Sequence, residues 1–358
     1  MAPVYLLLRE SVAFAPTLIS TGQHRELLGD ALALFAIEPD VELALMEPEQ
    51  RLAAFFGRCV DALDALVADR GFDAIIAQGD TSSVLAAALA AFYRRRPFFH
   101  VEAGLRTGDY TNPFPEEMNR TLAGRLAALH FAPTRGAGEN LRREGVASDA
   151  IEVTGNTVID ALHMVRRMRI PHGIPRTPGK HLIVVTAHRR ESFGAPLRRI
   201  MKALATIAAH HPEVEIVYPA HPNPEVHRAI AAVIGADSPI RVVPPLPYGA
   251  FVSLLDEAFL VLTDSGGIQE EAPALGKPVL VLREDTERPE AIEDGVALLV
   301  GTDTDTIVAE TERLLRDPAA YGRMAQGASP YGDGHAAGRI VARIARYFEA
   351  APAVHPAR

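Results

Sequence analysis

Short apolar runs alternate with amphipathic or alanine-rich stretches along most of the chain. The run Phe72–Ala77 stops just before a glycine and predicts a buried parallel strand. The alanine-rich stretch Ser83–Tyr93 follows a Thr-Ser pair that is suited to capping, and it predicts a helix. Phe98–Val101 predicts the next strand. This order of strand, helix and strand is typical of parallel α/β folds.

The same alternation continues to residue 165 and resumes at residue 181. Further strands are predicted at Ile151–Val153, His181–Thr186, Glu215–Tyr218, Arg241–Val243, Leu260–Leu262 and Val279–Leu282. Further helices are predicted at Gly138–Glu144, Val158–Val165, Pro196–His210, Pro224–Ile234 and Tyr248–Ala258. Between the two series, Ile170–Lys180 contains three prolines and two glycines and interrupts both periodicities. We therefore predict two doubly wound parallel-sheet domains, covering residues 1–168 and 178–335.

Composition narrows the functional class. The chain has 358 residues, 48% hydrophobic and 23% charged, which is ordinary for a globular protein of two domains. Its net charge of −9 argues against a nucleic-acid-binding surface. The one cysteine, Cys59, lies beside an apolar helical stripe, so we expect its side chain to pack in the core. A single cysteine cannot form an internal disulfide, and we therefore expect the protein in a reducing cytoplasm. Neither a membrane-spanning run nor a signal peptide is evident, so no membrane partner is expected.

Carboxylates gather in the first half of the chain. Asp80 and Glu102 follow two successive predicted strands, and the carboxyl ends of such strands are where open α/β sheets bind ligands. Glu116 and Glu117 follow Pro115, with Arg120 one helical turn further on. A well-started helix is the simpler interpretation of this Pro-Glu-Glu segment. Three acidic sites at converging positions favour an active site instead.

The second half has two further polar segments at predicted strand ends. In the first, His188 and Arg189 follow a strand and suit an anionic leaving group, although a solvated basic turn remains an alternative. His221 follows the next strand and lies between prolines, and for this histidine a structural role is an alternative to a functional one. In the second, Ser265, Gly266 and Gly267 begin a helix, where backbone amides and the helix dipole favour a phosphate. Neither a Walker loop nor a G-x-G-x-x-G fingerprint is present, which argues against ATP hydrolysis and a dinucleotide cofactor.

Several motifs together resemble one enzyme family, the non-hydrolysing UDP-N-acetylglucosamine 2-epimerases. The motifs are Q-G-D-T, H-V-E-A-G-L-R-T-G, P-E-E-M-N-R, G-N-T-V-I-D, H-R-R-E-S-F-G, D-S-G-G-I-Q-E-E, T-E-R-P-E and P-Y-G-D-G. They stand in the family's order over essentially the whole chain. The resemblance implies two Rossmann-like domains in the glycosyltransferase-B arrangement with a cleft between them. It also implies a homodimer and a closing helix, about residues 336–358, that completes the first domain.

The resemblance implies a reaction as well. Such enzymes invert C2 of UDP-GlcNAc to give UDP-ManNAc, a precursor for surface polysaccharides, by eliminating UDP to form 2-acetamidoglucal and adding it back. The positions that match catalytic residues are Asp80, Glu102, Glu116 and His188. The positions that match substrate-binding residues are Arg120, Phe251, Ser265, Gly266, Gly267, Glu271 and Arg288. The family uses no metal and no cofactor, so none is expected here.

Two features depart from the family pattern: the start of the sequence, and Leu246, which stands at a uracil-side position that is polar in the family. The family begins with a strand and a nucleotide-sugar-binding loop, whereas this sequence opens with a predicted helix over residues 1–9 and a strand near Pro16–Ser20. If the native protein lacked that first strand, we would expect weak stability and poor activity. An activator site for a second UDP-GlcNAc is implied at Gln23, His24, Arg189 and His221. Its pattern is incomplete because Glu26 replaces a glutamine.

Three other functions remain open on the sequence alone. A glycosyltransferase of the same architecture would need an acceptor site, and the carboxylate set argues against it. A hydrolysing epimerase usually carries an appended kinase domain, which is absent from this sequence. A catalytically impaired UDP-sugar-binding homologue would be consistent with a missing first strand.

Overall fold

The chain folds into two compact units. The computed structural model describes residues 1–23, 25–47, 50–189, 192–235, 238–286, 288–326 and 329–350. Unit 1 comprises Met1–Ala161 and the segment from Gly334 onward, and unit 2 comprises Leu162–Asp333. In each unit parallel strands alternate with helices, which confirms the predicted α/β class with two Rossmann-like parallel-sheet units. Among the described helices, none is both long and apolar enough to cross a membrane.

The strands of unit 1 form two parallel sheets. The two-stranded sheet pairs β1 (Ile19–Ser20) with β2 (Val41–Glu42). The four-stranded sheet has the order β3 (Ile75–Gln78), β4 (Phe98–Val101), β5 (Leu129–Ala132) and β6 (Ile151–Val153). In the second sheet, strands that are neighbours in the chain are also neighbours in space, so the loops after β3 and β4 leave the sheet side by side.

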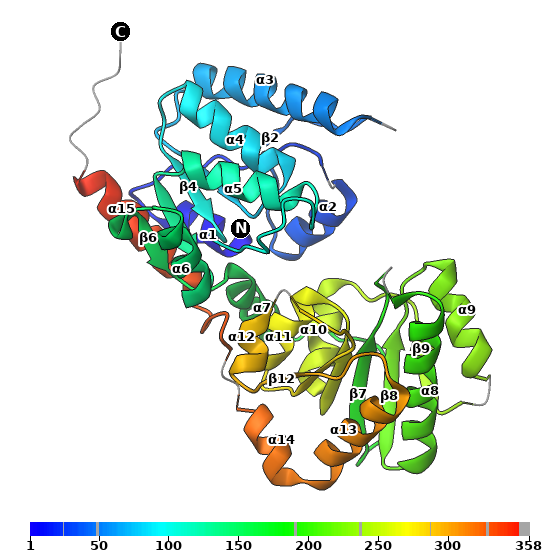
Figure 1. Ribbon diagram of the computed structural model, residues 1–358. Helices are drawn as coiled ribbons and strands as arrows, with labels where there is room; N and C mark the ends of the chain where they lie inside the picture. Colours follow the sequence, from blue (N-terminus) through cyan, green and yellow to red (C-terminus); the bar gives the residue numbers. More distant parts are fainter. Residues whose placement is uncertain are drawn as a thin grey trace. The chain divides into compact units, whose positions relative to one another are not determined.

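The helices of unit 1 cover these sheets. They are α1 (Ala2–Glu10), α2 (Arg25–Leu34), α3 (Leu52–Arg70), α4 (Ser82–Tyr93), α5 (Glu116–Leu126), α6 (Arg135–Arg143), the first turn of α7 (Thr157–Met168) and α15 (Ala336–Ala350), with the 3-10 turn η1 (Ser148–Ala150). Helix α4 lies between α3 and α5 (Figure 1). Its buried alanines let the neighbouring helices approach closely, and Cys59 of α3 is buried in this cluster, consistent with the packing role expected for it.

Local capping explains where the helices begin. The Thr81 hydroxyl accepts a hydrogen bond from Val84 N and caps α4 as the Thr-Ser pair predicts. Thr134 does the same for Ala137 N at 3.1 Å, so α6 begins before the predicted Gly138. Proline suits the first helical position, but Pro115 is the residue immediately before α5, and Glu116 is the first residue of the helix.

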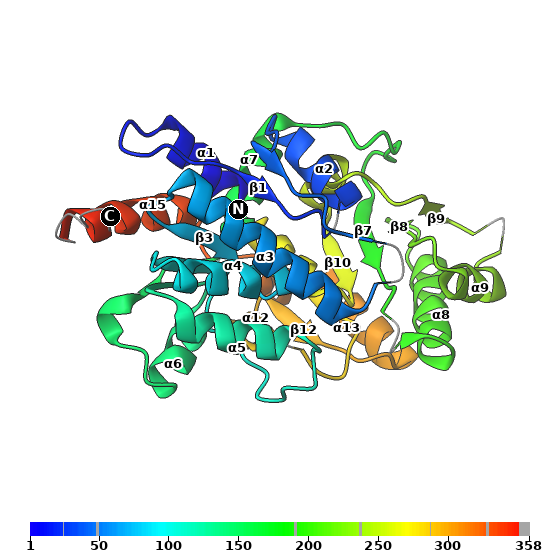
Figure 2. The same ribbon diagram turned by 90° about the horizontal axis from the view of Figure 1, so that it is seen from above.

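The last described helix packs against the first. Figure 2 shows α15 and α1 side by side, and both contribute to one apolar cluster with β4 and β5. Asp160 of α7 caps α15, because its two carboxylate oxygens accept hydrogen bonds from Ala336 N at 3.1 Å and Ala337 N at 2.9 Å. Helix α15 thus lies in unit 1 as far as Ala350, and the remainder of 336–358 lies outside the described residues.

Unit 2 contains one six-stranded parallel sheet. Its order is β12 (Ala297–Leu299), β11 (Val279–Val281), β10 (Leu260–Thr263), β7 (His181–Thr186), β8 (Val214–Pro219) and β9 (Ile240–Val243). Successive residues of β7, such as Ile183 and Val184, point to opposite faces of the sheet, and both are fully buried. Helices therefore cover both faces of the sheet, as the continuous apolar runs predict.

The helices of unit 2 follow the strands in turn. They are α8 (Ala195–His210), α9 (Pro224–Val233), α10 (Tyr248–Glu257), α11 (Gly266–Ala274), α12 (Pro289–Glu293), α13 (Thr304–Arg316) and α14 (Pro318–Met324). The boundary between the two units falls within α7, between Ala161 and Leu162, which is upstream of the predicted linker Ile170–Lys180. That segment is tied to unit 2, since Arg176 forms ion pairs with Glu215 at 3.3 Å and with Glu257 at 3.1 Å.

Candidate active site

Three carboxylates gather at one edge of the sheet in unit 1. Asp80 follows β3 and Glu102 follows β4, two paired parallel strands, while Glu116 is the first residue of α5. Burial raises the pKa of Asp80, Arg120 opposes this shift, and the charges of Glu102 and Glu116 raise it further. The three acids are therefore close enough to act on one another, as the strand-end positions predict. A carboxyl whose pKa moves toward neutrality is suited to proton transfer.

Arg120 connects this cluster to the loop that follows Glu102. Its guanidinium lies 2.7 Å from Asp80 Oδ2 and 3.6 Å from Glu117 Oε2. Glu117 is 1% exposed, and its Oε1 accepts hydrogen bonds from Thr107 N at 3.0 Å and Gly108 N at 3.1 Å. The Pro-Glu-Glu motif alone does not show that Glu117, and not Glu116, is the buried residue that anchors this loop. The i, i+3 spacing from Glu117 to Arg120 on one helix was the available signal.

Glu102 has an uncommon backbone conformation. Its φ of 62° lies in the left-handed region, which non-glycine residues seldom adopt. Its Oε2 accepts a hydrogen bond of 2.9 Å from Gln78 Nε2 at the end of β3. Strain of this kind, held in place by a neighbouring strand, recurs at functional positions.

Two buried histidines lie opposite each other on the neighbouring strands β4 and β5. His100 of β4 is fully buried and pairs through Nε2 with Gly79 O at 2.7 Å, while His130 of β5 is 2% exposed. Burial lowers the pKa of both imidazoles to about 4. Both side chains are therefore neutral near pH 7.

These histidines make the folded state sensitive to acid. Between pH 6.5 and about 4 the unfolded chain binds protons that the folded chain excludes, so stability falls as the pH falls through that window. We expect each histidine to account for on the order of 3 kcal/mol of that loss. Urea titrations across the window should show it, and the double variant His100→Gln/His130→Gln should flatten the dependence. An unchanged dependence in the double variant would contradict this assignment.

In unit 2, helix α11 begins with the predicted glycines. Ser265 is its N-cap residue and makes no side-chain capping bond, while Gly266 and Gly267 form the first turn. A Cβ at Gly267 would meet no atom within 4 Å, so there is open space beside the backbone. A helix terminus of this kind favours a phosphate group.

Two acidic residues of α11, behind this turn, each pair with a side chain from another segment of unit 2. Tyr248 of α10 donates a 2.7 Å hydrogen bond to Glu271 Oε1, and burial raises the pKa of Glu271 to about 7. The Arg288 guanidinium pairs with the buried Glu270 carboxylate, also on α11. Phe251 lies half-buried on α10. The sequence did not point to Tyr248, which lies 23 positions from its partner.

The remaining predicted positions fall into two groups. In unit 2, the ring of His188 stacks on that of His221, with centroids 5.4 Å apart. Arg189 follows on the same loop. In unit 1, Gln23 accepts a 2.8 Å hydrogen bond from Ser83 Oγ at the start of α4, while His24 lies outside the described residues.

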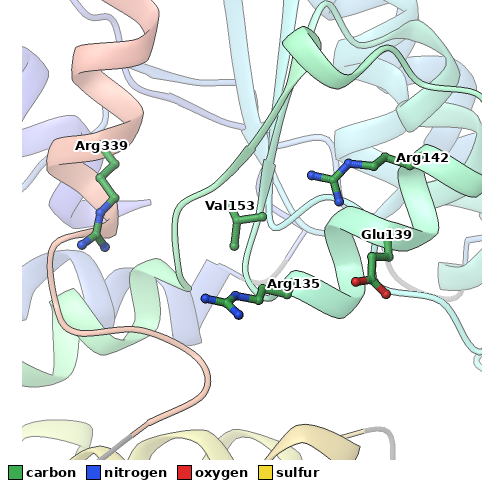
Figure 3. A pocket seen from close by; sticks show the side chains of 5 residues that line it. All are labelled: Arg135, Glu139, Arg142, Val153 and Arg339. Carbon is green, nitrogen blue, oxygen red and sulfur yellow. The ribbon is translucent and has the colours of Figure 1, made fainter.

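Unit 1 also has a basic hollow of about 570 Å³ away from these residues. Figure 3 shows its lining side chains, which come from α6, from the end of β6 and from α15. They are Arg135, Glu139, Arg142, Val153 and Arg339. All five are exposed at the surface, and the set includes none of the predicted site residues.

Comparison with known proteins identifies the family. The profile described as UDP-N-acetylglucosamine 2-epimerase matches residues 7–345. The UDP-N-acetylglucosamine 2-epimerase of Escherichia coli K12 is 48% identical over 351 residues, which is 95% of this chain and 93% of that one. The Neisseria meningitidis UDP-GlcNAc 2-epimerase bound to UDP-GlcNAc superposes with a TM-score of 0.86 at 39% identity, covering 97% of this chain and 96% of that one. A Methanocaldococcus jannaschii UDP-GlcNAc 2-epimerase in complex with UDP-GlcNAc and UDP gives a TM-score of 0.74 at 28% identity, covering 97% and 95%. The protein belongs to the UDP-N-acetylglucosamine 2-epimerase family.

Proposed function

We propose that this protein interconverts UDP-GlcNAc and UDP-ManNAc by inverting C2 of the sugar. The gathering of Glu102, Glu116 and Arg120 around Asp80 carries the proposal, because C2 inversion needs acid–base groups that remove and return a proton. The E. coli relative of the same name and the N. meningitidis complex with UDP-GlcNAc support it.

The carbon chemistry determines the order of the steps. The C2 proton of the substrate is not flanked by a carbonyl group, so direct abstraction would be very slow. Departure of UDP from C1 with loss of the C2 proton gives 2-acetamidoglucal, and addition of UDP with protonation of the other face of C2 completes the inversion. The carboxylates of unit 1 act on the proton in this scheme. Cationic groups must stabilise the departing diphosphate.

Unit 2 supplies the groups for the nucleotide. We assign the diphosphate to the first turn of α11 at Ser265–Gly267, with His188 and Arg288 as charged donors. Glu271 is suited to accept hydrogen bonds from the ribose hydroxyls, and Phe251 to contact the uracil. No step in this scheme requires a metal or a redox cofactor.

One experiment tests the reaction. Proton NMR of the protein with UDP-GlcNAc in D₂O should show UDP-ManNAc appearing with deuterium at C2. Free ManNAc accumulating with UDP would instead favour a hydrolysing epimerase. Persistence of UDP-GlcNAc with no C2 exchange, in a sample that binds UDP, would contradict the proposal and favour a catalytically impaired homologue.

The Tyr248–Glu271 pair gives a pH-dependent prediction for UDP binding. A deprotonated Glu271 accepts hydrogen bonds from the ribose hydroxyls, so UDP affinity should rise as the pH increases through about 7, the pKa of this carboxyl. The Tyr248 hydroxyl bond lowers that pKa, and Tyr248→Phe should therefore move the midpoint to higher pH. Calorimetric titration with UDP across this range measures both effects. An affinity that does not vary with pH in either protein would rule out this role for the carboxylate.

Further parts of the proposal rest on the resemblance. They are a homodimer, a cytoplasmic location, supply of precursors for surface polysaccharides, and activation by a second UDP-GlcNAc. The activator site would use Gln23, His24, Arg189 and His221. Sedimentation of the purified protein, and initial rates at increasing UDP-GlcNAc, would test the first and the last.

A further inference from the structure

A fully buried carboxylate organises the loop that carries His188. Asp264 follows β10 and has no exposed surface, and its backbone N–H donates to Thr186 O at the end of β7 at 3.0 Å. Its Oδ2 accepts hydrogen bonds from His188 N at 2.7 Å and Arg189 N at 2.8 Å. One carboxylate oxygen therefore ties the loop after β7 to the loop after β10.

The other oxygen of Asp264 faces the imidazole. Oδ1 is buried and accepts no hydrogen bond from any residue that the structure describes. His188 Nδ1 lies 3.5 Å from it, an ion-pair distance. An unpaired buried carboxylate oxygen is destabilising, and a small rotation of the His188 ring would satisfy it. The arrangement favours a proton on Nδ1.

Neighbouring elements hold the ring from its other sides. His221, after β8, stacks on His188 with ring planes 5° apart. The Tyr218 hydroxyl of β8 donates a hydrogen bond to Ala187 O, next to His188. Burial and the charge of Asp264 raise the pKa of this phenol. Asp264 and His221 therefore contact the imidazole itself, and Tyr218 supports the backbone of the preceding residue. The His188 side chain is still 39% exposed, so its outer edge can meet a ligand.

We infer that Asp264 is a positioning residue for the reaction: it holds His188 with Nδ1 protonated and with Nε2 directed outward, where it can meet the leaving diphosphate. A carboxylate behind a working imidazole fixes its tautomer and its orientation in this way. The inference rests on the proposed function for the role of His188. The contact between Asp264 and His188 is independent of that function.

Asp264→Asn separates this role from simple loop support. The amide oxygen can still accept the two backbone N–H bonds, so the loop is kept. The amide NH₂ then faces His188 Nδ1 and requires it to be an acceptor, which moves the proton to Nε2. Glu215→Gln is the matched control, since Glu215 is a 5% exposed acid of β8 that pairs with Arg176 and Arg241 and, like Asp264, accepts a backbone N–H, that of Thr177.

The first test needs no substrate. Nitrogen-15 NMR of histidine-labelled full-length protein should show His188, assigned by the loss of its signals in His188→Gln, with the proton on Nδ1 in the parent and in Glu215→Gln. In Asp264→Asn the proton should be on Nε2. Identical His188 signals in the parent and Asp264→Asn would overturn the inference, whether or not the protein is an epimerase.

The second test uses turnover. We expect Asp264→Asn to lower kcat for UDP-GlcNAc by about 10- to 100-fold with little change in KM, as when a group that orients an acting histidine is lost. Asp264→Ala should lower the melting temperature as well, because it also releases the two backbone N–H groups. An altered tautomer with unchanged kcat would overturn the role in the reaction. Failure of the parent to epimerise would instead contradict the proposed function and leave the NMR test to decide the contact.

Discussion

Replacing Asp80 with asparagine should lower kcat for C2 epimerisation by about 10²- to 10⁴-fold, the contribution of a positioned acid–base group. Asp80 lies 2.7 Å from Arg120, and its raised pKa shows that burial and two neighbouring carboxylates disfavour its charge. Asparagine has nearly the same shape and can still accept a hydrogen bond from Arg120, but it cannot exchange a proton. The loss should therefore appear in kcat and in C2 deuterium incorporation.

UDP binding and folding should change little in the same variant. Removing one of several clustered negative charges relieves repulsion, so the free energy of unfolding should stay the same or increase. Asp64→Asn is a suitable control, because Asp64 lies on α3 and pairs with the surface Arg94. NMR in D₂O measures turnover, and calorimetry measures UDP affinity. Turnover in Asp80→Asn within threefold of the control would remove Asp80 from the proton-transfer step.

Local sequence signals were sufficient for the strand ends that carry the carboxylates. An apolar run that ends before Gly79, and another that ends at Val101, placed Asp80 and Glu102 where the structure has them. Such runs indicate a parallel strand that is buried on both faces, and they can be recognised from a few consecutive residues. The cap at Thr81 was predictable for the same reason, since its partner is three residues away.

Contacts between distant segments were not predictable in this way. Asp264 bonds to residues 75 and 76 positions earlier in the chain, and only the pairing of β7 with β10 brings them together. The sequence marked the Ser-Gly-Gly that follows Asp264 and assigned no role to the aspartate itself. Tyr248 was missed in the same manner. The short elements α12, α14 and β12 also lacked a periodic signal, because three to seven residues are too few to show one.

Gly104→Ala should destabilise unit 1 by on the order of 3–5 kcal/mol, combining left-handed backbone strain with overpacking. Gly104 has φ of 90°, and a Cβ there would lie 2.3 Å from Ala137 O and 2.9 Å from Leu141 Cγ. Both contacts are with α6, whose Asn140 side chain donates a 2.9 Å hydrogen bond to Gly104 O. The backbone of α6 would have to move away for the methyl group to fit.

Gly145→Ala is the matched control. Gly145 has φ of 86°, close to that of Gly104, but a Cβ there would meet no atom within 4 Å. Its substitution should therefore cost only the backbone strain, about 1–2 kcal/mol. Urea denaturation of the two variants measures the difference, which isolates the contact with α6. Equal losses of unfolding free energy in the two variants would show that α6 moves away from the new methyl group at no energetic cost. A larger loss at Gly104 should also lower turnover in the folded fraction, because Glu102 lies two residues away and depends on the same segment for its strained φ of 62°.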